Sequence, residues 1–204
     1  MAERTGVLQE SAVDPDPLEQ FRRWFADAEA ADIRAPHALA LATADADGAP
    51  SARMVLLKGA DEAGFVFFTG YASRKAGELD ANPRAALLFH WDALGRQVRI
   101  EGGVERVSNE DSDAYFATRP RGAQLAAAAS RQSAVLSSRE ELDARVAELQ
   151  EEYSGKEVPR PAHWGGYRLV PTTYEFWQHR EDRSHDRLRY RRDGRAWVIE
   201  RLSP

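Results

Sequence analysis

The sequence predicts a mostly β fold with helices, of the α+β class, in which antiparallel strands form a barrel. Strand-like segments occupy both ends of the chain, with helical segments between them. The turns that join successive strands are short, which favours antiparallel pairing. The length of 204 residues, with 43% hydrophobic and 30% charged residues, fits one globular domain. We therefore expect a flexible tail over residues 1–15 and a single domain over residues 16–204.

The first predicted element is a helix that begins after Asp16. Asp16 is a favourable N-cap residue, and Pro17 suits the first helical position. Apolar residues then recur at helical spacing at Leu18, Phe21, Phe25 and Ala28. This helix is expected to cover a core and to end before Pro36.

Five strands are predicted next, at residues 38–43, 51–58, 65–69, 85–90 and 97–107. Turn residues at 45–48 join the first two strands into a hairpin. A short helix that opens at Ser73 and stops at Asn82-Pro83 separates the third strand from the fourth.

The middle of the chain is predicted to be helical and its end to return to strands. Helices are expected over residues 108–117 and 122–130, and a third follows a capping box formed by Ser138 and Glu141. The last strands are expected at residues 166–170, 173–177, 188–192 and 196–202. Asp193-Gly194 predicts a type I′ turn between the last two.

The composition excludes several classes of protein. There is no cysteine, so disulfides, thiolate metal sites and cysteine nucleophiles are excluded. No apolar stretch approaches the roughly 20 residues that span a bilayer, and no secretory signal opens the chain, so we expect a cytoplasmic protein without membrane contact. The net charge of −5, with acidic residues among the seven arginines of 180–195, argues against a nucleic-acid partner. Apart from His179 and His185 the histidines lack ligand-like spacing, so no metal site is expected.

Basic residues beside predicted strands are the main functional signal. Arg53 and Lys58 flank an apolar run, and Arg74 and Lys75 open a helix whose free N–H groups favour an anion. Together they predict a phosphate cradle, although solvated surface charge is the alternative for any one of them. On an ideal strand Arg53 and Lys58 point to opposite faces, so we expect two anions, or two ends of one ligand.

Two more groups of residues carry chemistry. One contains Tyr115, Arg119, Arg121, Gln132 and Ser133, and the other contains Trp177, Arg183, His185 and Arg187. The planar guanidinium of arginine suits phosphate and carboxylate recognition. Three separated arginine groups therefore predict a multiply anionic small ligand.

The sequence resembles the pyridoxine (pyridoxamine) 5′-phosphate oxidase family. The resemblance runs from about residue 16 to residue 204 and rests on many motifs in one order. These motifs are RMVLLK at 53–58, SRKA at 73–76, GRQV at 95–98, RPR at 119–121, SRQS at 130–133, WGGY at 164–167, EFWQ at 175–178, RSHDRL at 183–188 and RLSP at 201–204.

The resemblance implies an FMN-binding split β-barrel that works as a homodimer, with FMN in clefts where the two subunits meet. The residues it implies for the cofactor are Arg53, Met54, Val55, Leu56, Phe68, Thr69, Arg74, Lys75, Gln97, Gln132, Ser133, Trp177 and Arg187. Lys58, Tyr115 and Arg119 are implied to hold a substrate phosphate. Arg183 and His185 are implied to lie over a pyridine ring as the catalytic residues.

The implied reaction oxidises pyridoxine 5′-phosphate or pyridoxamine 5′-phosphate to pyridoxal 5′-phosphate. Hydride passes from C4′ to the flavin, and molecular oxygen then accepts the electrons and forms hydrogen peroxide. The protein is expected to position the substrate rather than to perform acid-base chemistry, with Arg183 as the orienting group.

Some residues depart from the family pattern. Ala123 stands where the phosphate pocket usually has a serine, residues 126–129 are all alanine, and His179-Arg180 replaces a Gly-Gly pair. The sequence also resembles the flavin oxidases of phenazine biosynthesis, so an oxidase of an aromatic secondary metabolite is the alternative. A flavin- or haem-binding split barrel without catalysis is a third hypothesis.

Overall fold

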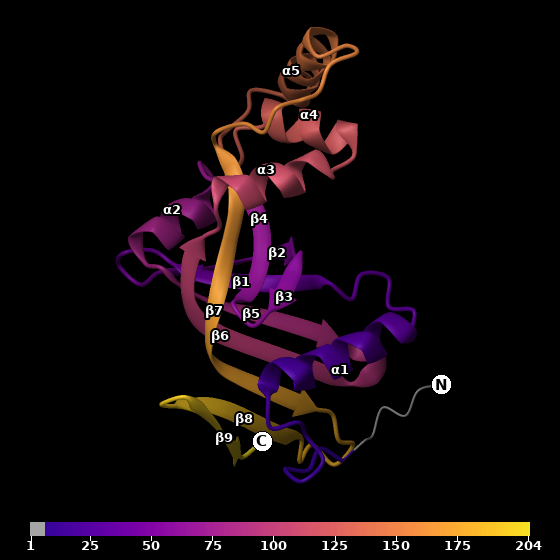
Figure 1. Cartoon of the computed structure of the whole chain (residues 1–204), viewed down its shortest axis with the longest axis vertical. Helices are drawn as coiled ribbons and strands as arrows, with labels where there is room; N and C mark the ends of the chain where they lie inside the picture. The colour runs from indigo at the N-terminus through magenta and orange to yellow at the C-terminus, as the bar shows by residue number, and fades with distance from the viewer. Residues whose placement is uncertain (1–6) are drawn as a thin grey trace.

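A single antiparallel sheet organises the computed structural model, which describes residues 7–204 (Figure 1). Its strands are β1 (Ala38–Ala44), β2 (Pro50–Leu56), β3 (Gly59–Asp61), β4 (Gly64–Gly70), β5 (Arg84–Trp91), β6 (Arg96–Arg106), β7 (Trp164–Gln178), β8 (Asp186–Asp193) and β9 (Ala196–Arg201). The order is β2-β1-β5-β6-β7-β4-β3, with β8 paired to β7 and β9 paired to β8. The predicted fold class, antiparallel strands with helices, is confirmed.

Most of the helices lie toward the upper end of the sheet (Figure 1). They are α1 (Pro17–Ala30), α2 (Arg74–Ala81), α3 (Asn109–Ala117), α4 (Arg121–Ala129) and α5 (Arg139–Glu152), with a short 3₁₀ turn η1 at Asp92–Leu94. α1 lies beside the lower part of the sheet, and α3, α4 and α5 gather around the upper end of β7. Among the described residues, no helix has the length and apolar character needed to cross a membrane.

The long strand β7 connects the two ends of the sheet. The sequence predicts two strands here, over 166–170 and 173–177, but they form one continuous strand. Its first half pairs with β4 and its second half with β8, and β6 pairs along both halves. The register between β6 and β7 shifts at Glu101 and Gly102, where Thr172 is left unpaired and β7 bends next to Pro171. A Cβ atom at Gly102 would lie 1.9 Å from the Val170 carbonyl oxygen, so this bend requires glycine.

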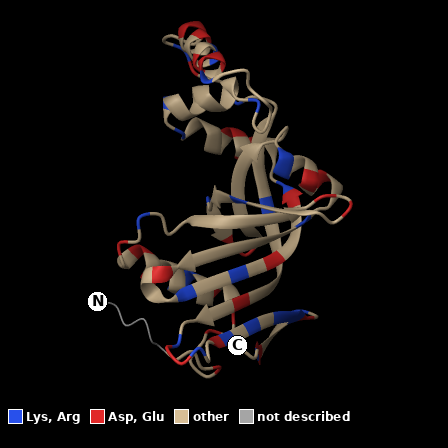
Figure 2. Cartoon of the chain, turned by 180° about the vertical axis from the view of Figure 1, so that it is seen from behind, with Lys and Arg blue, Asp and Glu red and all other residues tan. Residues whose placement is uncertain are grey.

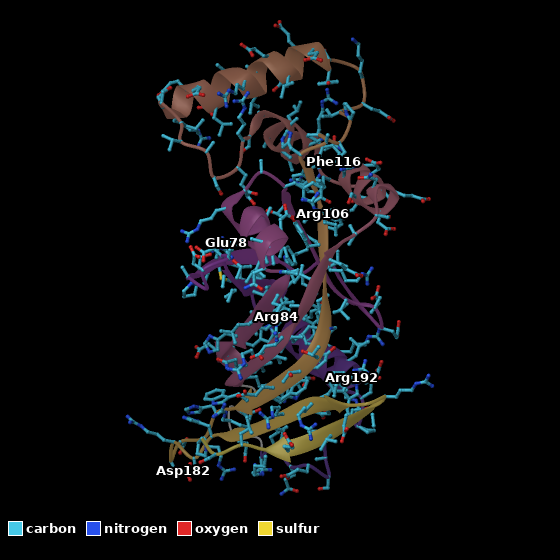
Figure 3. All side chains as sticks on the ribbon, turned by 90° about the vertical axis from the view of Figure 1, so that its left-hand side faces the viewer. Glu78, Arg84, Arg106, Phe116, Asp182 and Arg192 are labelled. Carbon is cyan, nitrogen blue, oxygen red and sulfur yellow. The ribbon has the colours of Figure 1, made fainter. Side chains whose placement is uncertain are left out.

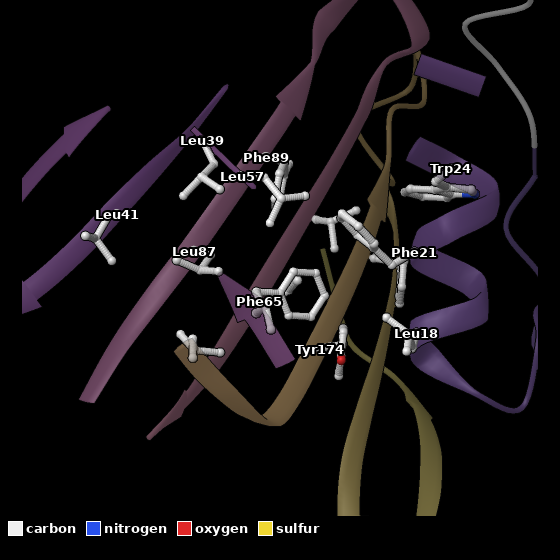
Figure 4. Close-up of a cluster of buried hydrophobic side chains, with 14 of the residues drawn as sticks. Leu18, Phe21, Trp24, Leu39, Leu41, Leu57, Phe65, Leu87, Phe89 and Tyr174 are labelled. Atoms are coloured by element: carbon white, nitrogen blue, oxygen red, sulfur yellow. The ribbon is translucent and has the colours of Figure 1, made fainter. Parts of the chain in front are cut away.

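The core lies between α1 and the sheet (Figure 4). The Asp16 carboxylate accepts the Leu18 N–H at 2.9 Å, so the predicted N-cap forms. The ring of Phe21 then packs 4.9 Å from that of Phe65 and 5.1 Å from that of Phe89, measured between centroids. Burying such aromatic rings supplies much of the stability that holds the barrel strands in place.

Two predicted local motifs are wrong. Only Gly194 of the last hairpin turn has a positive φ, of 61°, whereas a type I′ turn needs positive φ at both central residues. The side chain of Ser138 makes no capping bond to α5 among the described residues. Instead the Glu141 carboxylate accepts hydrogen bonds from the backbone N–H and the hydroxyl of Ser137, so the cap is displaced by one residue.

The segment before α1 packs against the end of the chain. Leu8 is buried, its N–H donates to Asp186 Oδ2 at 3.2 Å, and its carbonyl oxygen accepts from Arg201 at 2.8 Å. Residues 1–6 of the predicted tail lie outside the described residues. The division into a tail and one domain at residue 16 stays a prediction.

Candidate functional site

A cavity of about 1000 Å³ opens between the barrel strands and the helices α3 and α4. Figure 3 shows the region between the labelled side chains of Glu78 and Phe116. The cavity collects most of the residues predicted to hold a cofactor or a substrate phosphate. They are Arg53, Met54, Val55, Leu56, Lys58, Phe68, Thr69, Lys75, Tyr115, Arg119, Gln132 and Ser133.

Arg53 and Lys58 line the same cavity, together with Met54, Val55 and Leu56 between them, so the expectation that they face opposite sides stays a prediction. β2 ends at Leu56, and the N–H of Lys58 bonds instead to the carbonyl oxygen of Val66. Lys58 therefore lies beyond the strand, where the alternation of side chains no longer applies.

A carboxylate that the sequence does not single out holds the basic side chains at one end of the cavity. Glu78, on α2, is 5% exposed and pairs with Arg53 at 3.0 Å and with Arg74 at 2.8 Å. It also accepts hydrogen bonds from the hydroxyls of Thr43 and Ser51. Burial opposes ionisation of Glu78, but these four donors outweigh it and lower its pKa to about 2. Arg74 thus reaches the same cluster as Arg53 although it does not line the cavity.

Lys75 and the loop at 130–133 complete this end. The Nζ of Lys75 is buried and donates to Thr69 Oγ1 at 3.1 Å, and burial together with the nearby Arg53 lowers its pKa. Gln132 Oε1 accepts from Thr69 Oγ1 at 2.8 Å, and Ser133 Oγ accepts the N–H of Arg74 at 3.2 Å. These bonds join β4, the start of α2 and the loop into one wall.

The other end of the cavity has an aromatic wall. The rings of Tyr115 and Phe68 stack with centroids 4.0 Å apart, and the ring of Trp164 lies 5.4 Å from that of Phe68. A Cβ atom at Gly166 would approach Phe68 to 2.8 Å, so glycine provides the space in which that ring lies. A planar ligand would meet flat apolar surface here.

Arg119 is a half-buried cation in this wall, and it has no ion pair with any of the described residues. Its guanidinium stacks on Trp164, 4.6 Å from the ring centroid, and burial lowers its pKa. Its buried Nη1 has no hydrogen-bond partner within residues 7–204. Lys58 lies nearby, with Nζ 5.9 Å from the centroid of the Tyr115 ring. An anionic group would satisfy Arg119 and would fit the predicted substrate phosphate.

The remaining predicted residues form a second group, on β6, β7, β8 and the turn between β7 and β8. Gln97, Trp177 and Arg187 pair side by side across β6, β7 and β8. They share the outward face of the sheet with Glu175, which binds Arg187 at 2.8 Å, and charged residues of both signs alternate across this face (Figure 2). Arg187 also donates to the carbonyl oxygen of Ser203 at 2.8 Å.

Arg183 and His185 belong to this second group, in the turn between β7 and β8. In Figure 3 Asp182 of the same turn lies at the lower end of the molecule, far below Glu78. His185 Nδ1 accepts the N–H of Arg180 at 3.1 Å, so a neutral imidazole carries its proton on Nε2. The His185 ring lies 4.6 Å from that of Trp177 and 5.3 Å from that of His179. Arg183 has a φ of 64°, which is unfavourable for a residue other than glycine.

Two family models together match most of the chain. The model of pyridoxamine 5′-phosphate oxidase matches residues 25–153, and that of the pyridoxine 5′-phosphate oxidase C-terminal dimerisation region matches residues 164–204. The chain belongs to the pyridoxamine 5′-phosphate oxidase family. The family that the sequence resembles and the predicted enzyme class, an oxidase, are thereby confirmed.

Relatives in the pyridoxamine 5′-phosphate oxidase family are similar over nearly their whole length. The pyridoxine/pyridoxamine 5′-phosphate oxidase of Rubrobacter xylanophilus is 59% identical over 98% of this chain and 92% of its own. That of Cupriavidus taiwanensis is 58% identical over 98% of this chain and 94% of its own.

Solved structures agree with the assignment to the pyridoxamine 5′-phosphate oxidase fold. PhzG from Burkholderia lata, in complex with tetrahydrophenazine-1-carboxylic acid, has a TM-score of 0.92 and 37% identity, covering 98% of this chain and 100% of its own. A pyridoxamine 5′-phosphate oxidase-related, FMN-binding protein from Nostoc punctiforme has a TM-score of 0.73 and 18% identity, covering 90% of this chain and 97% of its own.

Only some of the departures from the oxidase family pattern lie at the cavity. Ala126 and Ala127 line the cavity, whereas Ala123 is not among its lining residues. His163 also lines it with a buried, unpartnered Nε2, although the sequence offers no signal for it beyond its position before the WGGY motif. Within residues 7–204, no cluster of three or more histidine, aspartate or glutamate side chains is arranged to hold a metal ion.

Proposed function

We propose that this member of the oxidase family is an FMN-dependent oxidase. It converts pyridoxine 5′-phosphate or pyridoxamine 5′-phosphate to pyridoxal 5′-phosphate, with molecular oxygen reduced to hydrogen peroxide. The observation that carries the proposal is the buried, unpartnered Nη1 of Arg119 near Lys58, in a cavity whose far end holds a separate cluster of basic residues. Two separate anionic positions fit the phosphates of a cofactor and a substrate. The names of the relatives support the same assignment.

The residues present fit FMN. Arg53, Arg74 and Lys75 would hold its phosphate beside the start of α2, where backbone N–H groups favour an anion. Gln132 and Ser133 would close the wall around it. Bound FMN supplies the chemistry of hydride acceptance and of reoxidation by oxygen. The residues of the chain bind and orient the reactants and exclude water.

We place the second group of residues at the same site through a homodimer. Gln97, Trp177 and Arg187 do not line the cavity of their own chain. The match to a dimerisation region covers the segment that holds two of them, Trp177 and Arg187. In a twofold dimer, each cavity would receive the Trp177 row and the turn that carries Arg183 and His185 from the partner subunit. The His185 Nε2–H would then donate to the substrate, and Arg183 would orient its C4′ carbon.

The test is a peroxide assay with the purified protein after reconstitution with FMN. Pyridoxine 5′-phosphate should yield one peroxide for each pyridoxal 5′-phosphate formed. The phosphorylated amine should do the same, with one water consumed and one ammonia released. Absence of turnover with both compounds, in a protein that binds FMN, would contradict the proposed substrate.

Binding of the substrate phosphate should depend on Lys58 and Arg119. Lys58→Ala or Arg119→Ala removes a charge-assisted contact that is worth about 1.5–3 kcal/mol, so KM for pyridoxine 5′-phosphate should rise about ten- to a hundredfold. The flavin content should stay at the wild-type level, because neither residue belongs to the Glu78 cluster. Steady-state kinetics and the visible spectrum of each variant measure the two effects. An unchanged KM in both variants would show that the phosphate lies elsewhere.

The second candidate function is oxidation of an aromatic metabolite, and the similarity to PhzG supports it. The two Ala side chains on the cavity wall leave room for a wider ring system than a pyridine. Such a substrate would lack a phosphate, and Arg119 would then bind a carboxylate. Peroxide released with an aromatic carboxylic acid and not with phosphorylated pyridines would favour this second function.

A further inference from the structure

The Glu78 carboxylate pairs with the same basic side chains that a bound phosphate would contact. Its carboxylate lies within the cluster of basic residues proposed to bind the FMN phosphate, and it pairs with two of them, Arg53 and Arg74. These partners lower its pKa, so it is ionised at neutral pH. Three cations and one carboxylate therefore meet at this end of the cavity.

Arg53 directs all of its terminal N–H groups to the protein. Nη1 donates to the Leu41 carbonyl oxygen and to Thr43 Oγ1, and Nη2 donates to Ser51 Oγ and to Glu78. A phosphate that bonds to these groups must displace one of the acceptors. Glu78 is the acceptor that a dianion also repels, so it is the one most affected.

We propose that Glu78 is a counter-charge that competes with a phosphate for Arg53 and Arg74 and thereby sets how tightly the chain retains its cofactor. Glu78 stabilises the three cations when no phosphate is bound and opposes the phosphate when one binds. The three neutral acceptors of Arg53 keep its guanidinium in place even without Glu78. Glu78 is thus a positioning residue whose effect on affinity is electrostatic. The inference rests on the proposed function, because it takes the ligand of this cluster to be the phosphate of FMN.

The test compares Glu78→Gln with the wild type in three measurements. FMN should bind about five- to tenfold more tightly to Glu78→Gln, and the difference should shrink at high salt. Riboflavin, which has no phosphate, should bind the two proteins equally. The variant without flavin should melt at a lower temperature than the wild type, so FMN should raise its melting temperature by more.

Asp80→Asn is the matched control. Asp80 lies on the same helix and pairs with Arg106 on the far side from the cluster, so its loss changes the net charge equally. Its affinity for FMN should equal that of the wild type. If Glu78→Gln does not fold, Glu78→Asp keeps the charge but shortens its reach to Arg74. FMN should then bind about twofold more tightly.

The outcomes separate this inference from the proposed function. Weaker or unchanged FMN binding by Glu78→Gln, or an equal effect on FMN and riboflavin, overturns the competition. Failure of the wild type to bind FMN, or binding that Arg53→Ala leaves unchanged, overturns the cofactor site instead.

Discussion

Arg53→Ala should purify almost free of flavin. The arginine is 20% exposed and is held by Glu78, so its removal deletes one of three cations at the proposed FMN phosphate and leaves the buried carboxylate poorly paired. Loss of a charge-assisted contact, together with the repulsion between Glu78 and phosphate, should weaken FMN binding by at least about a hundredfold. Flavin absorbance per subunit and titration with FMN measure the effect.

Arg168→Ala is the control for this experiment. Arg168 is 19% exposed and pairs with Asp61 on the outside of the barrel, so the change removes a similarly buried arginine away from the cavity. This variant should keep its full flavin content. If Arg53→Ala also keeps it, the basic cluster around Glu78 is not the phosphate site.

A mixed dimer should recover flavin binding that neither parent dimer has. Arg53→Ala damages the cavity, and Arg187→Ala damages the group that the partner subunit is proposed to contribute. A dimer of one Arg53→Ala subunit with one Arg187→Ala subunit then has one intact site and one site with both changes. It should bind about one FMN per dimer, whereas each parent dimer should bind almost none. Two affinity tags isolate the mixed dimer, and absorbance gives the flavin content.

The reciprocal arrangement provides the control. A subunit that carries both changes, paired with a wild-type subunit, damages both sites if each is shared between subunits. This dimer should therefore bind almost no FMN. The opposite pattern, with one FMN here and none in the first mixed dimer, would show that each site lies within one chain.

Local patterns in the sequence predict most of the elements, because alternation and capping depend on neighbouring residues. The short helix that opens at Ser73 ends at Ala81, as the Asn82-Pro83 pair requires. The continuity of β7 was not predictable in this way. Proline predicts the end of a strand, so Pro171 suggests two separate strands. The strand continues because its pairing with β6 shifts register at Gly102, about 70 residues away along the chain.

The candidate site could also be predicted from the sequence only in part. The motifs predict a set of basic residues, and the structure brings Arg53 and Lys58 from that set to one cavity. The role of Glu78 was not predicted, because its partners Thr43, Ser51 and Arg53 are more than twenty positions away in the sequence. Its spacing of four residues from Arg74 was the one available signal.

At Arg183 a change that raises the stability of the protein would lower its proposed activity. A side chain other than glycine at a φ of 64° stores conformational free energy, on the order of 1 kcal/mol, that glycine would release. Selection for heat resistance alone would therefore favour Arg183→Gly, and the same change would remove the guanidinium proposed to orient the substrate. The turn between β7 and β8 is a position at which a thermostabilised variant would be expected to lose turnover, and any such screen on this chain should keep residue 183 fixed.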